Sequence, residues 1–584
     1  MKWWLMRKGW LISPQNEAHI KSLSKALGIS ELLAHILINR GYNEKTKARR
    51  FLQPRLSHLY EPSLMPGLTR AAERISSALA NEERIVLYGD YDADGISGLA
   101  LLKQCLSFLG KEADFYIPHR LEEGYGLNMD ALRSLKAKGA NLVITVDCGT
   151  TALEEAAYAR KEGLDLIITD HHECGDTLPE CVALINPKLP GSTYPFRHLS
   201  GVGVAFKLAW ALGECLSPGK KVSDGLREHL LNWLGLVALG TVADVVPLLG
   251  ENRVLVKYGL EALKASSQPG IKALMEVSGF ERGLDARAVA FGLGPRINAA
   301  GRLGDATRAC ELLTTDSIEM AREIARSLDA YNRRRQKLEQ DILAEAVATI
   351  ESENLAQAKA IVLTSPRWHA GVLGIVASRI VERYHRPTVL LTLAGESAQG
   401  SARSIPDFDI FEALSSCGDM FISCGGHAQA AGLRLDKNLV RAFRERFLEE
   451  AEERMKSEDL VPKLSLDAEV PLSLLNEEAV EELGRLRPFG QGNPEPVFAA
   501  RVKVVGRTRR VGNGKHLRFV VRQGSVSFPA IAFGRGKDEA WLEKEGQIDL
   551  AFIPEINAWR NRKSVQLKVV DMAASEAQEE KRAG

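Results

Sequence analysis

Aspartate and histidine residues gather in four short clusters of the sequence, and these residue types are suited to holding divalent cations. The clusters are Gly89-Asp90-Tyr91-Asp92-Ala93-Asp94-Gly95, Asp147, Asp170-His171-His172 and Asp244. Alternate carboxylates in an extended loop can point at adjacent hard cations, and a carboxylate beside two imidazoles suits Mn²⁺, Zn²⁺ or Fe better than Mg²⁺ alone. Two cations bridged by a carboxylate, roughly 3.5–4 Å apart, clamp a phosphodiester and its attacking water. The clusters therefore indicate a metal-dependent phosphodiesterase, most simply a nuclease.

Each cluster also has an interpretation without such a centre. The first matches the start of a calcium-binding EF-hand loop, but its twelfth position is Leu101, where a bidentate Glu is needed. An isolated Asp-rich turn is commonly a helix cap or a solvated loop. Asp147 could cap the next helix, although the threonines that follow it can do so instead. A lone histidine is usually structural, and Asp244 in its apolar stretch could pair with a buried arginine rather than with a cation.

Taken together, the clusters predict a two-metal centre with defined roles. We expect Asp147 to bridge the two ions, Asp92 to bind one of them, and the remaining ligands to be shared around the pair. His172 is expected to act on the phosphate or to support a ligand. The predicted metal ligands are Asp90, Asp92, Asp94, Asp147, His171 and Asp244, and the predicted catalytic residues are Asp147, His172 and Asp92.

The elements that must position these clusters are short apolar runs at residues 85–88, 142–146 and 166–169, separated by amphipathic stretches such as residues 151–162. Strands alternating with helices predict a parallel α/β sheet. Ligands of such sheets lie beyond the carboxyl ends of the strands, where three of the clusters fall.

The remaining sequence predicts further domains. Residues 305–365 contain neither Gly nor Pro, which indicates a long connecting helix before a second α/β lobe. After Pro462, five short alternating segments with Gly-rich turns predict a small β-barrel. The expected layout is an N-terminal helical lead (1–65), a catalytic α/β domain (66–265), a helical region with the long connector (266–358), a second α/β lobe (359–455), a barrel (456–574) and a disordered tail (575–584).

Composition supports several globular domains, because 584 residues exceed what one hydrophobic core usually serves. With 45% apolar and 26% charged residues, disorder is excluded as a general description. The most apolar stretch, residues 234–249, contains Asp244 and is shorter than the roughly 20 residues of a membrane span. Eight cysteines without a Cys-x-x-Cys pair argue against a disulfide framework or a zinc ribbon. We therefore expect a soluble, cytoplasmic protein without a membrane partner.

The predicted barrel is basic, since residues 501–568 hold 15 Lys and Arg against 6 Asp and Glu. A basic module favours a polyanionic partner, although a solvated basic face would look the same. Its arginines and aromatic residues could contact single-stranded nucleic acid, with two bases or fewer stacked.

These motifs resemble the DHH phosphoesterase superfamily, and within it the RecJ family of single-stranded-DNA-specific exonucleases. The matching segments lie at residues 87–95, 117–126, 144–149, 170–172, 185–188, 239–244, 295–302, 368–379, 400–404, 425–427 and 487–498. The resemblance implies a DHH lobe, a long helix, a DHH-associated lobe and an OB-fold barrel. It also implies two Mn²⁺ or Mg²⁺ ions, 5′→3′ degradation of single-stranded DNA to 5′-mononucleotides in repair and recombination, and a monomer that works with a helicase and a single-strand-binding protein.

The resemblance further implies contacts to the substrate. Arg120 and Tyr125 match positions near the 5′ phosphate, and a guanidinium suits a terminal phosphate. Such a turn could equally be a salt-bridged surface loop. The other expected substrate residues are Arg296, Asn298, Arg302, His369, Ser401, Arg403 and His427, of which the two histidines could instead be structural.

One position departs from the smaller DHH phosphodiesterases, which carry a His four residues before the Asp-x-Asp pair. Tyr88 stands there in this sequence, so Asp90 is expected to take part of that coordination. Two other functions compete with the exonuclease. One is a phosphodiesterase for short RNA, cyclic dinucleotides or polyphosphate, and the other is a replication scaffold, as in relatives that have lost ligands.

Overall fold

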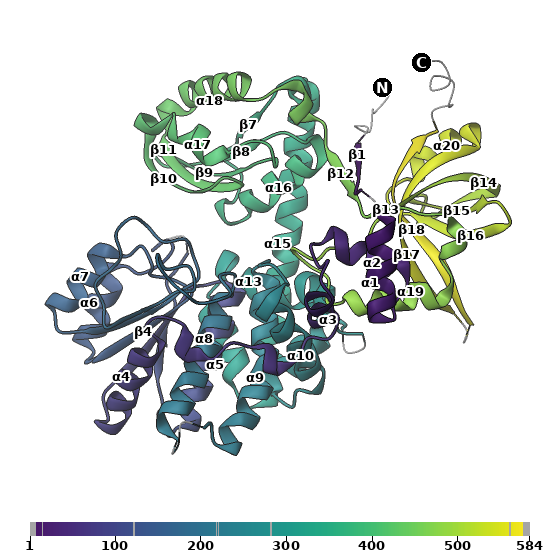
Figure 1. Ribbon diagram of the computed structural model, residues 1–584. Coiled ribbons are helices and arrows are strands. Elements are labelled where there is room, and N and C mark those ends of the chain that lie inside the picture. The colour runs from purple at the N-terminus through teal and green to yellow at the C-terminus, as the bar shows by residue number, and fades with distance from the viewer. Residues whose placement is uncertain are drawn as a thin grey trace. The chain divides into compact units, whose positions relative to one another are not determined.

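The computed structural model describes residues 8–14, 16–120, 123–217, 219, 221–280, 283–559 and 562–575, which form two compact units. One unit comprises Leu56–Leu460 with Gly490–Gly492, and the other combines the chain up to Arg55 with Val461–Phe489 and the residues from Asn493 onward. Many of the elements are labelled in Figure 1. Of the tail expected to be disordered, residues 576–584 lie outside the described residues.

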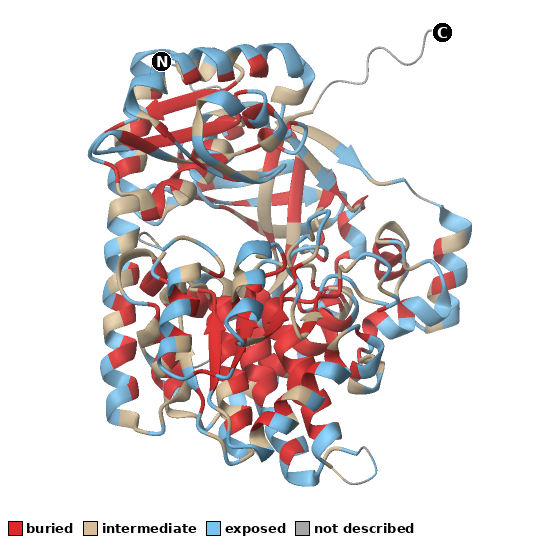
Figure 2. Cartoon of the chain, turned by 90° about the vertical axis from the view of Figure 1, so that its left-hand side faces the viewer, coloured by how far each residue is buried: buried red, intermediate tan, exposed pale blue. Residues whose placement is uncertain are grey.

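A five-stranded sheet forms the centre of the first lobe, in the order β3 (Asp114–Tyr116), β2 (Ile85–Gly89), β4 (Leu142–Val146), β5 (Asp165–Thr169) and β6 (Ala183–Ile185). Every neighbouring pair is parallel. Strands β2 and β4 are buried along their whole length, which explains why they are apolar without alternation (Figure 2). The predicted parallel α/β sheet is confirmed.

Helices cover both faces of this sheet. Ile85 and Leu87 pack with α4 (Leu68–Ala80), α5 (Ala93–Phe108), α8 (Gly201–Leu216) and α9 (Asp224–Ala243), whereas Val86 and Tyr88 pack with α6 (Met129–Ala137) and α7 (Leu153–Lys161). Because side chains of a strand alternate between faces, one short run supplies both cores. Helix α10 (Gly250–Ala265) packs on α9.

A helical region and a second lobe complete this unit. The region contains α11 (Pro269–Ser278), α12 (Ala286–Ala288), η4 (Val289–Leu293), α13 (Gly294–Leu303), α14 (Thr307–Thr314) and the 35-residue helix α15 (Ile318–Ser352), which confirms the predicted connector. The second sheet has the order β10 (Phe421–His427), β11 (Ala430–Asp436), β9 (Ser397–Arg403), β8 (Thr388–Ala394) and β7 (Ile361–Thr364), and only β7 and β8 are parallel. Helices α16 (Leu373–Tyr384), α17 (Ile410–Ser415) and α18 (Val440–Arg454) accompany it.

The other unit contains the predicted barrel. Strands β14 (Phe498–Val511), β15 (His516–Gln523), β16 (Val526–Ala532), β18 (Arg562–Ala574) and β17 (Gln547–Trp559) pair in that order, and β17 closes onto β14. Only β16 and β18 are parallel among these five. A closed five-stranded barrel of this kind agrees with the expected OB fold. Short elements β13 (Ala468–Glu469), α19 (Glu477–Leu483) and α20 (Glu539–Glu545) adjoin it.

The N-terminal helices α1 (Glu17–Leu27), α2 (Glu31–Asn39) and α3 (Lys45–Leu52) belong to the same compact unit as the barrel. Strand β1 (Gly9–Ile12) pairs in parallel with β12 (Lys463–Leu466). The sequence suggested a separate lead over residues 1–65, whereas this pairing joins residues that are more than 450 positions apart. Among the described residues, no helix combines the length and the apolar character that a bilayer crossing requires.

Candidate metal centre

The carboxyl ends of three parallel strands bring the predicted ligand clusters into one row. The backbone N–H of Asp90 donates to the Val146 carbonyl over 3.2 Å, that of Asp147 to Thr169 over 2.9 Å, and that of Asp170 to Ile185 over 3.0 Å. In each case the residue that follows one strand is therefore hydrogen-bonded to the last residue of the neighbouring strand in the sheet. The sheet register places the three clusters side by side.

The side chains of these clusters form three overlapping groups of potential metal ligands, and the atoms of each group lie within 4.8 Å of one another. Asp147 belongs to two groups, and His171 also belongs to two. The groups are Asp90, Asp92 and Asp147; Asp147, His171 and His172; and Asp94, His171 and Asp244. Shared members are what a bridged pair of ions requires.

His171 lies at the middle of this arrangement. Its Nε2 is 3.1 Å from Asp147 Oδ1, 3.6 Å from Asp244 Oδ2 and 3.8 Å from Asp94 Oδ2. One imidazole nitrogen cannot satisfy three carboxylates with a single proton. A cation among them can interact with all four groups.

Three buried ligand atoms have no hydrogen-bond partner in the described structure: Asp90 Oδ1, Asp147 Oδ1 and His171 Nε2. Burial of polar atoms without partners is costly, and such atoms need an explanation in a folded protein. Their donor types, carboxylate oxygen and imidazole nitrogen, are those that Mn²⁺ accepts. The residues present therefore fit a divalent metal centre.

The pKa values of the ligand side chains also show that, without a metal, these buried groups are unfavourable in their charged forms. Burial and the neighbouring Asp92 raise the pKa of Asp94 to about 7, and burial together with Asp94 raises the pKa of Asp244 to about 9. The pKa values of Asp147 and Asp90 lie well above their usual range, chiefly because both carboxyls are buried. Burial and the neighbouring His172 lower the pKa of His171 to about 3, which keeps this ring neutral and able to bind a metal.

Helix ends hold several of these side chains. Asp92 caps α5, its Oδ1 accepting from the backbone N–H groups of Asp94 and Gly95. Asp94 accepts from the N–H groups of Gly201 and Val202 at the N-terminus of α8, over 2.6 and 3.0 Å. Asp244 follows the last residue of α9, where the negative end of the helix dipole favours a cation.

Asp170 positions the histidines and does not belong to a ligand group. It accepts from the backbone N–H groups of Thr150, His171 and His172 and from His172 Nδ1, the last over 2.7 Å. Burial alone would raise the pKa of Asp170, but the hydrogen bond from His172 and the nearby histidines lower it below its usual range. Burial would lower the pKa of His172, and the bond to Asp170 raises it. Tyr125 Oη also contacts His172 Nδ1, at 3.0 Å.

Two glycines lie directly against the ligand side chains, and neither was predicted from the sequence. A Cβ at Gly201 would lie 2.5 Å from Asp147 Oδ1, and one at Gly240 would lie 2.6 Å from Asp94 Oδ1. Both positions therefore exclude any larger side chain. Gly240 lies inside a motif already noted, residues 239–244, but only the packing of α9 against α5 reveals its purpose.

Tyr88, which replaces the His of smaller relatives, points away from the ligand groups. It is fully buried, and its hydroxyl donates to the Gly126 carbonyl over 2.9 Å and accepts from Asn128 Nδ2 over 3.2 Å. It thus anchors the segment that carries Tyr125. Asp90, with its unpartnered oxygen, lies instead in the group with Asp92 and Asp147.

Three arginines from distant parts of the sequence lie close enough to influence one another. The pKa of Arg302 is lowered to about 9 by burial and by the nearby charges of Arg120, Arg335 and Arg403. The pKa of Arg403 is lowered by burial and by the nearby charge of Arg120. Arg403 also donates to Ser401 Oγ over 3.1 Å, and Arg120 stacks on Tyr91 with 4.7 Å to the ring centre. Among the described residues, Arg302 has no carboxylate within ion-pair distance. A concentration of positive charge in which one guanidinium has no paired carboxylate is suited to an anion.

Other expected substrate residues are engaged in structural bonds. Arg296 pairs with Asp329 and donates to the carbonyls of Gly292 and Val277, which ties α13 to α15 and α11. Asn298 Oδ1 accepts from the Ala93 N–H over 2.7 Å at the start of α5, and His369 Nδ1 accepts from the Gly371 N–H. These bonds favour positioning roles over the substrate contacts that we expected. His427 is exposed at the end of β10.

Known domain families match three parts of the chain: the DHH family N-terminal domain over residues 84–241, the DHHA1 domain over residues 357–457 and the RecJ OB domain over residues 466–571. The chain is 40% identical over 574 residues to the single-stranded-DNA-specific exonuclease RecJ of Bacillus subtilis, covering 97% of this chain and 71% of the relative. It is 37% identical to the RecJ exonuclease of Thermus thermophilus, covering 96% of this chain and 78% of the relative.

The structure is similar to the crystal structure of RecJ from Thermus thermophilus in complex with Mn²⁺. The TM-score is 0.84 at 35% sequence identity, over 97% of this chain and 80% of that one. A crystal structure of the exonuclease RecJ bound to manganese is 40% identical with a TM-score of 0.60, and covers 69% of this chain and 97% of that chain. The similarity to the first of these structures thus extends over the lobe that carries the ligand groups.

Proposed function

We propose that the protein removes nucleotides from the 5′ end of single-stranded DNA, because the chain belongs to the RecJ family of single-stranded-DNA-specific exonucleases. The enzyme is a metal-dependent DNA exonuclease of the DHH phosphoesterase superfamily, and its role in DNA repair and recombination fits the family. The observation that supports hydrolysis most directly is the set of overlapping ligand groups that share Asp147 and His171. Mn²⁺ or Mg²⁺ is the cofactor that this donor set accepts.

We assign the ligands by the groups in which they lie. Asp147 would hold both ions, because its Oδ1 is unpartnered and its side chain belongs to two groups. Asp90 and Asp92 would hold one ion with it, and Asp94, His171 and Asp244 would hold the other. Bound there, two divalent cations would lower the pKa of a water and neutralise charge on the phosphate that it attacks.

His172 assists at the phosphate. Its Nδ1 is fixed by Asp170 over 2.7 Å, which leaves Nε2 as the ring nitrogen available to a phosphate oxygen. The hydrogen bond to Asp170 raises the pKa of His172, so the ring holds a proton more readily and can donate it. Asp170 is therefore a positioning residue.

The arginine cluster formed by Arg120, Arg302 and Arg403, with Ser401, binds the terminal 5′ phosphate. The cluster has an excess of positive charge, and Arg302 has no ion-pair partner among the described residues. A terminal phosphate carries more negative charge than an internal diester, so this cluster selects an end rather than an internal bond. Tyr125, 51% exposed beside His172, is placed to contact the nucleotide at that end.

Several finer expectations about the protein's surroundings remain predictions. The cytoplasmic location is one of them. The helicase and single-strand-binding partners and the monomeric state rest on the family resemblance.

The test uses the purified full chain with Mn²⁺ and four substrates: a 5′-phosphorylated single strand blocked at its 3′ end, the same strand blocked at its 5′ end, a duplex, and a dinucleotide. We expect mononucleotides from the strand with an open 5′ end and little product from the others. Release from an open 3′ end, or equal attack on duplex, would contradict the proposal. Preference for the dinucleotide would favour the small-phosphodiesterase alternative, and binding without hydrolysis would favour the scaffold.

A further inference from the structure

A cavity of about 520 Å³ lies far from the metal centre, at the opposite ends of two helices that serve it. Helix α5 carries Asp94 in its first turn, whereas Lys103, Gln104 and Phe108 of its last turns line the cavity. At 1.5 Å per residue, about 20 Å of helix separate Asp94 from Phe108. In α9 the cavity residues lie in the first half, and Asp244 follows the last turn. The cavity is therefore separate from the metal centre.

One wall of the cavity is aromatic. Phe108 is 42% exposed, and its ring centre lies 4.5 Å from that of His229, with 51° between the planes. His229 in turn lies 5.5 Å from the buried Trp233. Exposed rings backed by a buried ring offer a firm surface on which a planar ligand can stack.

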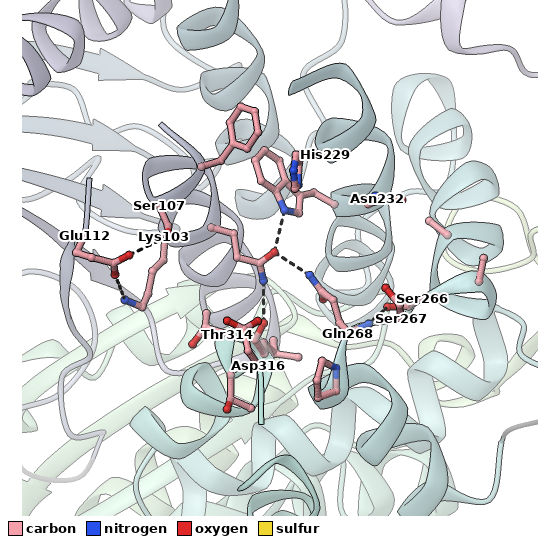
Figure 3. A pocket seen from close by; sticks show the side chains of 18 residues that line it. Lys103, Ser107, Glu112, His229, Asn232, Ser266, Ser267, Gln268, Thr314 and Asp316 are labelled. Carbon is pink, nitrogen blue, oxygen red and sulfur yellow. Dashed lines mark hydrogen bonds and ion pairs between the residues drawn. The ribbon is translucent and has the colours of Figure 1, made fainter. Parts of the chain in front are cut away.

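The floor of the cavity is held rigidly by one amide side chain. Gln104 Oε1 accepts from Trp233 Nε1 and from Gln268 Nε2, both over 2.8 Å, and Gln104 Nε2 donates to the Leu313 carbonyl over 2.8 Å (Figure 3). These bonds join α5, α9 and the segments before α11 and at the end of α14. A ligand would meet a surface already fixed in shape, which lowers the entropic cost of binding.

The rim supplies polar groups that are not used elsewhere in the described structure. Asn232, Ser267 and Asp316 line the cavity, and no side-chain hydrogen bond or ion pair involves them among the described residues. An amide can pair with the edge of a heterocyclic base, and a carboxylate can accept from ribose hydroxyls. The unpaired groups thus match a base and a sugar.

The charge of the cavity argues against a phosphorylated ligand. Lys103 lies 3.7 Å from Glu112, so this cation is already neutralised, and Asp316 adds a negative charge. The formal charges of Lys103, Glu112 and Asp316 sum to −1, which repels a phosphate. The size falls within the range of about 300–1,000 Å³ that is usual for small-molecule sites.

We propose that this cavity binds a ribonucleoside, with the base stacked on Phe108 beside His229 and the ribose hydroxyls facing Asp316. Asn232 contacts the edge of the base. The site takes neither the strand being degraded nor the nucleotide released, because both carry phosphate. It lies on α5 and α9, the same helices that hold Asp94 and Asp244.

The experiment titrates the full chain, with Mn²⁺ present, by calorimetry and by ligand-observed NMR. The probes are adenosine, guanosine, cytidine and uridine, their 2′-deoxy forms and their 5′-monophosphates. We expect at least one ribonucleoside to bind in a way that depends on Phe108, whereas binding of its monophosphate at the metal centre should not depend on Phe108. Phe108→Ala should weaken binding of the ribonucleoside at least about tenfold, as for loss of one stacking face. Its exonuclease rate on long single strands should stay unchanged, because Phe108 is remote from the metal centre.

Leu231→Ala is the matched control, since Leu231 is also 42% exposed and lies on α9 without lining the cavity. It should leave nucleoside binding unchanged. Asp316→Asn should reduce the preference for a ribonucleoside over its 2′-deoxy form. No binding of any nucleoside at millimolar concentration, unchanged nucleoside binding by Phe108→Ala, or a larger effect of Phe108→Ala on the monophosphate than on the nucleoside would overturn the proposal. None of these results bears on the exonuclease activity, which the strand digestion tests independently.

Discussion

Gly201, the first residue of α8, is the position where the addition of one methyl group should cost the most activity. Its backbone N–H donates to Asp94, and a Cβ at this position would lie 2.5 Å from Oδ1, 2.6 Å from Cγ and 2.7 Å from Cβ of Asp147. Because even the Cβ of Asp147 is too close, rotation of that side chain cannot relieve the contact. Gly201→Ala must therefore displace Asp147, the proposed bridging ligand, or the start of α8.

The expected magnitude follows from these distances. Non-bonded heavy atoms prefer about 3.5 Å, so the added methyl requires a displacement of about 1 Å. A misplacement of that size at a catalytic centre can cost roughly 100-fold in rate, equivalent to about 2.7 kcal/mol. Alanine is favoured over glycine within a helix by roughly 0.5–1 kcal/mol, which offsets part of the strain, so the protein should remain folded.

Gly203→Ala provides a matched control two residues further along α8. A Cβ there would meet Leu199 Cδ2 and Ser200 Oγ at 3.3 Å, and it would not contact a ligand. This variant should keep its activity within about threefold of the wild type. Both variants gain the same helix propensity, so their difference reports the contact with Asp147 alone.

The assay measures kcat/KM for nucleotide release from a 5′-phosphorylated single strand, at a series of Mn²⁺ concentrations, together with Tm. We expect Gly201→Ala to lose activity and to need more Mn²⁺, while its Tm stays close to that of the wild type. Wild-type activity in Gly201→Ala would refute the reasoning, and so would an equal loss in Gly203→Ala.

Three further predictions concern the same lobe. Asp147→Ala should abolish turnover yet bind single-stranded DNA in a fluorescence anisotropy titration, and loss of both would contradict a role confined to the metal centre. Arg302→Ala should reduce the rate ratio between 5′-phosphorylated and 5′-hydroxyl strands towards one. Arg308→Ala is the control, because Arg308 already pairs with Glu311 and Glu323, and this variant should keep the wild-type rate ratio. In EDTA, the pKa of Asp94 is raised from 3.8 in the unfolded chain to about 7 in the folded protein. Between these pH values the folded protein keeps a proton that the unfolded chain has lost. The free energy of unfolding, measured in urea, should therefore fall as the pH rises from about 4 to 7, and it should fall less in Asp94→Asn. A slope that is unchanged in this variant would contradict the assignment.

The sequence singled out residues that the structure brings together, because their signals are local. An apolar run that ends in an Asp predicts a strand with a carboxylate at its carboxyl end, and the order of such runs predicts the parallel sheet that places them together. The long helix α15 and the barrel were predictable for the same reason, since periodicity and the spacing of Gly and Pro are properties of neighbouring residues.

Residues whose roles depend on distant partners were harder to interpret. Arg296 was expected at the substrate, but α15 presents Asp329 to it, and the resulting pair ties two helices together. Asn298 caps α5 at a residue 205 positions away. Polar residue types alone cannot distinguish a side chain that binds substrate from one that binds another helix.

The sequence by itself determined which residues could bind metal, because residue type and position at a strand end decide that chemistry. Only the tertiary structure decided which of them lie within 4.8 Å of one another, that Asp90 rather than Tyr88 belongs to these groups, and that Gly201 and Gly240 leave room for them. It also brought Arg120, Arg302 and Arg403 together from three separate segments. These outcomes depend on distances between elements far apart in the chain, which packing sets and no local pattern records.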